Sequence, residues 1–174
     1  VIQKDIGAYL SKLDKDYGII RVQRPMFSKP NTRSLRYRIN DKFLNFWFRF
    51  FFKYKGALEI GNTNFVRQLI ERDYPTYSGM ALEDLVRSLL KESMQYSEVG
   101  NFWQKGNRNE IDVIALNSLT KKAIVGEVKI NPKKISLTKL QQKATVLSKD
   151  LGGYTIDYRG FSLADITDLN TCIL

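Results

Sequence analysis

Apolar residues recur at helical spacing at the start of the chain and at alternating spacing shortly after it. Within residues 1–14 they fall three to four positions apart, with lysines elsewhere on the turn, which predicts an amphipathic helix. Residues 19–26 and 34–39 are rich in β-branched and alternating positions, and the turn-forming segment 28–32 separates them. We therefore expect a helix followed by a β-hairpin.

This order matches the last helix and wing of a winged helix-turn-helix, whose first two helices would lie upstream of Val1. The predicted wing is basic, with Arg21, Arg24, Lys29, Arg33, Arg36 and Arg38. A winged helix commonly binds DNA through a recognition helix in the major groove, while wing residues contact phosphates. Many winged helices serve instead as protein interaction modules, so both roles stay open.

An aromatic segment follows the hairpin. Eight of the fourteen residues in 41–54 are Phe, Trp or Leu, and one polar stripe repeats every four residues, so we expect a largely buried core or interdomain helix. Asn62 or Thr63 can cap a further helix. Pro75 and Gly79 are predicted to end this part of the chain. The expected domains are 1–56 (partial winged helix and aromatic helix), 57–78 (helical connector) and 79–174.

The second half alternates between helical and strand patterns. A helix over 80–93 turns Leu82, Leu85, Val86 and Leu89 inward, and strands follow near 96–99, 110–116 and 123–130. Ser136 can cap a helix to about residue 148 that turns Leu137, Leu140, Ala144 and Leu147 inward, and 154–158 is a final strand. The predicted order is α-β-β-β-α-β. Strands that are apolar on both faces are typical of a sheet covered on each side, so we expect an α/β (α+β) fold with a central mixed sheet.

The composition narrows the possible chemistry. The 174 residues contain no histidine and one cysteine, Cys172, which excludes Ser-His-Asp and Cys-His hydrolases, zinc proteases and cysteine-based metal sites. A single cysteine also predicts a reducing, cytoplasmic setting. The longest apolar run is too short and too polar to span a membrane. The chain begins at Val1 with no leader, so we expect a part of a longer protein.

The positive charge is concentrated in the first half. The chain carries a net charge of +10; residues 1–80 hold 15 Lys/Arg against 7 Asp/Glu, and residues 81–174 hold 13 against 11. A basic half favours a polyanion partner, because neutralising phosphates releases counterions. The same charge would be expected if it only keeps the domain soluble, or if it faces an acidic partner domain.

Charged side chains interrupt the apolar strands of the second half. Alternation along a strand puts Glu110 and Asp112 on one face and Ile111, Val113 and Ala115 on the other. By the same rule Glu127 and Lys129 share a face of the next strand. Carboxylates gathered on an apolar sheet are costly unless a cation compensates them, and Mg²⁺ prefers carboxylate oxygens.

The candidate site follows from this pattern. Asp112 and Glu127 are the expected metal ligands, Lys129 would hold or help deprotonate a bound water, and Glu83 could reach the metal through water. The alternative treats Glu83 as an acid favoured by the first turn of its helix and Glu127 with Lys129 as a charged edge-strand pair. Lys105, Arg108 and Gln141 are candidate contacts to nucleic acid.

A Glu in a helix is followed by an Asp in a strand and by Glu-x-Lys in the next strand. This order of charged residues resembles that of the PD-(D/E)XK nuclease superfamily over about residues 79–158. More specifically, the segments YRINDKFLNFWFRFF, GMALEDLVRSLL, GNRNEIDVIAL and GEVK resemble the C-terminal region of archaeal-type AAA-superfamily ATPases of bacteria and archaea. The resemblance implies that Glu83, Asp112, Glu127 and Lys129 occupy the superfamily's catalytic positions. Ile111 stands where the superfamily's name has proline.

The resemblance implies a partial winged helix followed by a restriction-endonuclease-like core. It further implies Mg²⁺- or Mn²⁺-dependent hydrolysis of DNA phosphodiesters, with ATP bound only by a missing upstream ATPase domain. Many such nucleases act as homodimers. The alternative function is a non-catalytic module that binds DNA or regulates that ATPase through a degenerate nuclease fold.

Overall fold

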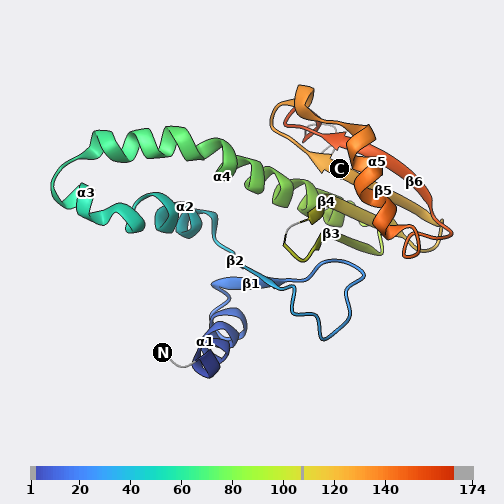
Figure 1. Ribbon diagram of the computed structural model, residues 1–174, viewed down its shortest axis with the longest axis horizontal. Helices are drawn as coiled ribbons and strands as arrows, with labels where there is room; N and C mark the ends of the chain where they lie inside the picture. Colours follow the sequence, from blue (N-terminus) through green and yellow to red (C-terminus); the bar gives the residue numbers. More distant parts are fainter. Residues whose placement is uncertain (1–2, 107, 167–174) are drawn as a thin grey trace. The chain divides into compact units, whose positions relative to one another are not determined.

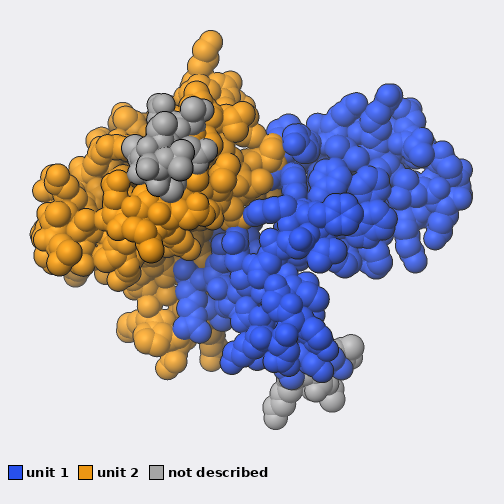
Figure 2. All heavy atoms as spheres, turned by 180° about the vertical axis from the view of Figure 1, so that it is seen from behind, with its two compact units in different colours: residues 1–24, 35–77 blue, residues 25–34, 78–174 orange. Residues whose placement is uncertain are grey.

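The computed structural model describes residues 3–106 and 108–166 (Figure 1). The chain divides into two compact units. Unit 1 comprises residues 1–24 and 35–77, and unit 2 comprises residues 25–34 and 78–174 (Figure 2). Residues 1 and 2 of the first predicted helix, Asn107 of the polar turn and Cys172 lie outside the described residues.

Unit 1 begins with the expected helix and hairpin. Helix α1 (Gln3–Lys15) precedes the antiparallel strands β1 (Ile20–Gln23) and β2 (Arg36–Ile39). Their register pairs Ile20 with Ile39 and Arg21 with Arg38. The prediction of a helix followed by a hairpin is therefore confirmed. The loop between the two strands, residues 25–34, belongs to unit 2.

The aromatic segment is shorter and more exposed than its composition predicts. It forms α2 (Lys42–Phe50), the 3₁₀ turn η1 (Phe52–Tyr54) and α3 (Lys55–Glu59), and Asp41 caps α2 by accepting the Leu44 N–H at 2.7 Å. Phe50 is buried, whereas Phe43, Trp47, Phe48 and Phe52 are 43–68% exposed. The expectation of a largely buried helix was wrong for the described residues, because only one stripe of the segment packs inward.

Helix α4 (Thr63–Glu92) runs on through the predicted boundary. Its N-terminus is capped as expected, because the Asn62 side chain accepts the Phe65 N–H at 3.2 Å. Pro75 lies inside the helix and does not end it. The apolar stripe before Pro75 includes Val66 and Leu69, and the stripe after it includes Leu82 and Val86, all buried. Burial on both sides of Pro75 outweighs the cost of a proline in the helix interior.

Unit 2 is built on a four-stranded mixed sheet. The strands β3 (Glu98–Gln104), β4 (Arg108–Asn117), β5 (Lys122–Val128) and β6 (Thr155–Phe161) lie side by side in that order. The pairs β3–β4 and β4–β5 are antiparallel, and β5–β6 is parallel. Between β5 and β6 the chain forms η2 (Pro132–Lys134), α5 (Leu137–Ala144) and η3 (Thr145–Leu147). The predicted α-β-β-β-α-β order and the mixed sheet are confirmed.

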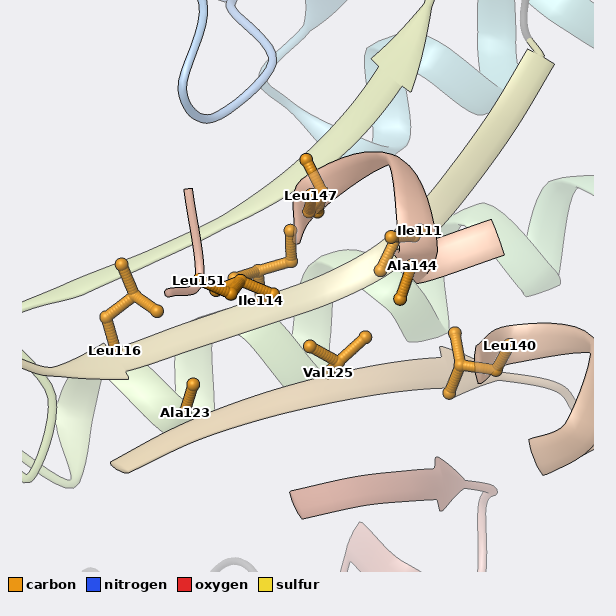
Figure 3. Close-up of a cluster of buried hydrophobic side chains, with 9 residues drawn as sticks. All are labelled: Ile111, Ile114, Leu116, Ala123, Val125, Leu140, Ala144, Leu147 and Leu151. Atoms are coloured by element: carbon orange, nitrogen blue, oxygen red, sulfur yellow. The ribbon is translucent and has the colours of Figure 1, made fainter. Parts of the chain in front are cut away.

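Helices cover both faces of this sheet. On one face Leu140, Ala144, Leu147 and Leu151 pack against β4 and β5 (Figure 3). On the other face Leu82, Val86 and Leu90 of α4 pack against the same strands and Phe161. Two residues expected to point inward do not: Leu85 is 42% exposed and Leu137 is 43% exposed. Each lies at the edge of its apolar stripe, outside the residues that pack against the sheet.

Candidate functional site

The predicted strand alternation fails in β4 directly beside Asp112. Gly100 pairs with Ile114 and Phe102 pairs with Ile111, so β4 carries one more residue than β3 between these pairs. Such a bulge reverses the alternation. Ile111 therefore packs in the cluster on the α5 face, whereas Val113 and Ala115 pack against α4. The expectation that Ile111 and Val113 share a face was wrong, and the extra residue is the reason.

The same region is where β4 and β5 stop pairing as regular strands. Their ladder runs from Asn117–Lys122 to Val113–Gly126. Two residues beyond Gly126, the Val128 N–H donates to the Asp112 carboxylate, at 2.9 Å from Oδ2. A side-chain oxygen thus replaces a backbone carbonyl in the ladder. The bulge and this hydrogen bond together direct Asp112 toward the end of β5.

Three of the four predicted site residues come together at this end of the sheet. The Lys129 Nζ atom lies 3.4 Å from Asp112 Oδ2 and 3.5 Å from Glu127 Oε1. The side chains of Asp112 and Glu127 are only 11% and 9% exposed, and that of Lys129 is 37% exposed. The two carboxylates therefore converge on one ammonium group that still reaches solvent.

Glu127 is also held from the α5 side. The Ser136 N–H, at the N-cap of α5, donates to Glu127 Oε2 at 2.9 Å, and Lys143 Nζ lies 3.8 Å from Glu127 Oε1. Each carboxylate oxygen of this buried side chain thus faces a donor or a cation. A buried carboxylate is tolerable only under that condition.

The pKa of Lys129 lies above the ordinary lysine value. Burial, the largest single influence, lowers this pKa, but the charges of Asp112 and Glu127 and their hydrogen bonds together raise it by more. Lys129 is therefore a cation at neutral pH. In this state it acts as a hydrogen-bond donor and a positive charge rather than as a proton acceptor.

Arg87, which the sequence pattern did not single out, supports the site from α4. Its side chain is 8% exposed, and its guanidinium donates to the Asp112 carbonyl oxygen and, at 2.7 Å, to Asp84 Oδ1. An arginine on a helix is usually solvated, so the pattern alone gives little warning. The available signals are its i,i+4 spacing from Glu83 and its i,i+3 spacing from Asp84.

Glu83 lies next to Arg87, with Oε2 3.8 Å from Nη1. Within residues 3–106 and 108–166 no three acidic, histidine or cysteine side chains gather into a group that could hold a metal ion. The structure thus brings together Asp112, Glu127 and Lys129 and does not add Glu83 as a third carboxylate.

Two converging carboxylates still fit Mg²⁺ or Mn²⁺. Magnesium is usually bound by one or two carboxylates, with waters and substrate phosphate oxygens completing its shell. Asp112 and Glu127 supply that donor set, because oxygens of both already lie within 3.5 Å of one cationic atom. The residues present therefore fit a loosely held divalent ion better than a closed all-protein cage.

The predicted nucleic-acid contacts fall into three groups. Arg21 lies on β1, and Arg24 directly follows that strand. Arg36 lies on β2, and Arg33 precedes that strand. Gln141 is exposed on α5. Three further cations line one pocket of unit 2, namely Lys29, Lys105 and Arg108.

Comparison with known proteins places the chain in a family. Residues 47–143 match the model of DUF234, described as archaeal and bacterial proteins of unknown function. The chain belongs to the DUF234 family. The match covers α2 to α5, and so includes Asp112, Glu127 and Lys129.

One curated relative extends the match. The chain is 33% identical over 132 residues to the uncharacterized protein MJECL04 of Methanocaldococcus jannaschii. The alignment covers 72% of this DUF234 chain and 29% of the length of that relative. No solved structure matches the chain. In the ranges that the structure describes, every helix is too short or too polar to cross a lipid bilayer.

Proposed function

We propose that this DUF234 chain carries a divalent-metal-dependent site that hydrolyses nucleic-acid phosphodiesters. The observation that carries the proposal is the convergence on Lys129 of the buried Glu127 carboxylate and the Asp112 carboxylate, 11% exposed, beside a β-bulge in a covered apolar sheet. Assembling two carboxylates with so little exposure costs free energy that an inert fold would avoid. A function that needs a cation and a phosphate at this point accounts for the arrangement.

Asp112 and Glu127 are the residues that would hold Mg²⁺ or Mn²⁺. When bound, such an ion stabilises charge on a phosphate and lowers the pKa of a coordinated water. Lys129, protonated at neutral pH, would donate a hydrogen bond to the attacking water or to a phosphate oxygen. Arg87 fixes the backbone of Asp112 from behind, and the Ser136 N–H fixes the rotamer of Glu127.

The wider context follows from the resemblance of the sequence to C-terminal regions of AAA-superfamily ATPases. We propose that the helix and hairpin of unit 1 complete a winged helix that binds DNA through Arg21, Arg24 and Arg36. ATP would act on an upstream domain of the same polypeptide. Two copies acting as a homodimer would bring one site to each strand of a duplex.

One observation favours a second candidate, a non-catalytic module that binds DNA or regulates the ATPase. Glu83, the outer acid of the nuclease pattern, lies against Arg87, and the described residues hold no third carboxylate at the site. A fold that had lost catalysis could keep the remaining ion pairs for stability alone.

A cleavage assay separates the two candidates. The purified chain is incubated with supercoiled plasmid and labelled single-stranded DNA in magnesium, in manganese and in EDTA. The proposal predicts metal-dependent nicking or cutting that is lost in Asp112→Asn and Lys129→Met and retained in the surface variant Lys122→Met. Equal cutting by all four proteins would identify a contaminant, and no cutting in either metal would favour the second candidate.

A further inference from the structure

A basic pocket lies between the loop 25–34 and the β3–β4 hairpin, all within unit 2. Its volume is about 580 Å³. Its walls come from the loop, from the end of β3 and from the start of β4. Arg108, which lines the pocket, and Asp112 both lie on β4, four residues and therefore about 13 Å apart along the strand.

The loop wall is fixed to the sheet and is not a free hairpin tip. The Met26 N–H donates to the Asn101 carbonyl oxygen at 2.9 Å, and Met26 and Phe27 pack against the cluster on the α5 face. The Met26 side chain also fills the space above Gly100, where an added Cβ would lie 2.7 Å from its Cγ. Gly100 thus lets the loop sit directly on β3.

The loop also holds its own shape. The Thr32 N–H donates to the Lys29 carbonyl at 2.9 Å, and the Ser34 N–H donates to Thr32 Oγ1 at 3.2 Å. The wall is therefore formed before any ligand arrives. A preformed wall lowers the ordering cost of binding.

The chemistry of the walls suits an anion. Three exposed cations line the pocket, Lys29, Lys105 and Arg108, and no carboxylate is among the described lining residues. Hydroxyl and amide side chains complete the polar lining: Ser28, Asn31, Thr32, Ser34 and Gln104. Cations together with hydroxyls and amides are the groups that contact nucleic-acid phosphates and sugars.

An aromatic ring, that of Phe102, distinguishes the pocket from a plain phosphate site. Phe102 is half-buried in its wall, and Trp103, 4% exposed, lies beside it. Proteins that bind single strands combine a basic groove with aromatic side chains on which unpaired bases stack. In a duplex the base faces are already stacked and cannot enter such a pocket.

We propose that this pocket binds an unpaired nucleotide of a single-stranded nucleic acid, with phosphates on the three cations and a base against Phe102. The pocket would hold the strand that enters the Asp112–Glu127 site, and only this last step rests on the proposed function. The binding itself is independent of cleavage.

The test measures binding in EDTA, so that no cleavage occurs. Fluorescein-labelled oligodeoxythymidylate, alone or annealed to oligodeoxyadenylate, is titrated with the 174-residue chain over a series of salt concentrations, and anisotropy is recorded. The test variant is Lys29→Ala with Lys105→Ala. The control is Lys122→Ala with Lys149→Ala, which removes the same charge from two other exposed positions of unit 2.

The proposal predicts tighter binding of the single strand than of the duplex. It also predicts that the Lys29/Lys105 variant reduces the slope of log K against log salt by about 1.4, at about 0.7 per lost phosphate contact, while the control pair leaves the slope at its original value. Equal effects of the two pairs would overturn the pocket assignment. Equal affinity for single strand and duplex would overturn the single-strand assignment.

The two proposals fail separately. If binding behaves as predicted and no metal-dependent cleavage is found, the proposed function falls and the pocket assignment stands. If Asp112→Asn abolishes cleavage while the Lys29/Lys105 variant binds like the control pair, the pocket assignment falls alone.

Discussion

Replacing Lys129 by methionine removes the ammonium group on which the two buried carboxylates converge. At 3.4 and 3.5 Å each contact has a Coulomb energy of about 5 kcal/mol at an effective dielectric constant of about 20, before desolvation is subtracted. Breaking a fully buried pair costs about 3–5 kcal/mol. Because 37% of the Lys129 side chain is exposed and screened by water, we expect a loss of about 1–3 kcal/mol in the free energy of unfolding.

The metal dependence of this variant carries more information than the loss itself. Without the ammonium, Asp112 and Glu127 repel each other, and a divalent cation becomes their best partner. Binding to the folded state stabilises it by RT ln(1 + [L]/Kd), about 2.7 kcal/mol when the free ion is at about 100 times Kd. Millimolar magnesium should therefore stabilise Lys129→Met more than it stabilises the wild type.

The assay is equilibrium urea unfolding followed by circular dichroism, in EDTA and in millimolar magnesium. Lys143→Met is the matched control, since Lys143 is equally exposed at 38% but lies 3.8 Å from one carboxylate only. It should lose less than about 1 kcal/mol and gain little from magnesium. If Lys129→Met were as stable as the wild type in EDTA and magnesium left its midpoint unchanged, the reasoning about the cluster would be refuted.

Three further changes test the surroundings of the site. Arg87→Met should lower the free energy of unfolding by about 3 kcal/mol, because it removes a charged donor from the Asp112 carbonyl and from the Asp84 carboxylate, which is 12% exposed; urea midpoints check this, and a loss within error contradicts it. Gly126→Ala should cost about 1–3 kcal/mol, because the new Cβ would lie 2.6 Å from the buried Phe161 ring; a neutral or stabilising effect on thermal midpoints would show that the ring can move. The pKa of Lys129 is raised in the folded chain, so its contribution to the free energy of unfolding is complete below the ordinary lysine pKa of about 10.4. That contribution is lost as pH rises through the pKa of the folded state. The difference in stability between wild type and Lys129→Met should therefore narrow only in that alkaline range.

Local patterns predicted the helices and strands well because their signals lie within a few residues of each other. Asn62 and Ser136 were identified as possible helix caps, and each accepts a backbone N–H in the structure. The strand order of unit 2 followed from alternating apolar runs and turn residues. The continuation of α4 through Pro75 was not predictable in this way, because it depends on what the helix buries on either side.

The details of the site depended on pairing between strands, which one strand cannot reveal. The extra residue beside Asp112 appears only when β4 is aligned with β3, so simple alternation put Ile111 on the wrong face. The convergence of Asp112, Glu127 and Lys129 was nevertheless anticipated, since the residues of β5 keep their alternation. Arg87 was missed because its burial arises from the packing of α4 on the sheet.

The aromatic helix α2 shows that composition can predict a helix without predicting how much of it is buried. Composition correctly indicated a helix with little polar surface, but it could not say what covers that surface. In unit 1 Phe50 packs against Phe46 and Tyr77, with ring centroids 4.8 and 5.9 Å away, while Phe43 remains 68% exposed. Burial is a property of the partner as much as of the residue.

Isothermal titration with manganese tests the central claim most directly, since it measures the metal site without requiring turnover. The account predicts one site in the wild type, its loss in Asp112→Asn and in Glu127→Gln, and its retention in Glu83→Gln, where the replaced carboxylate lies against Arg87. Identical manganese binding by the wild type and the Asp112 and Glu127 variants, or no binding by any of them, would contradict it.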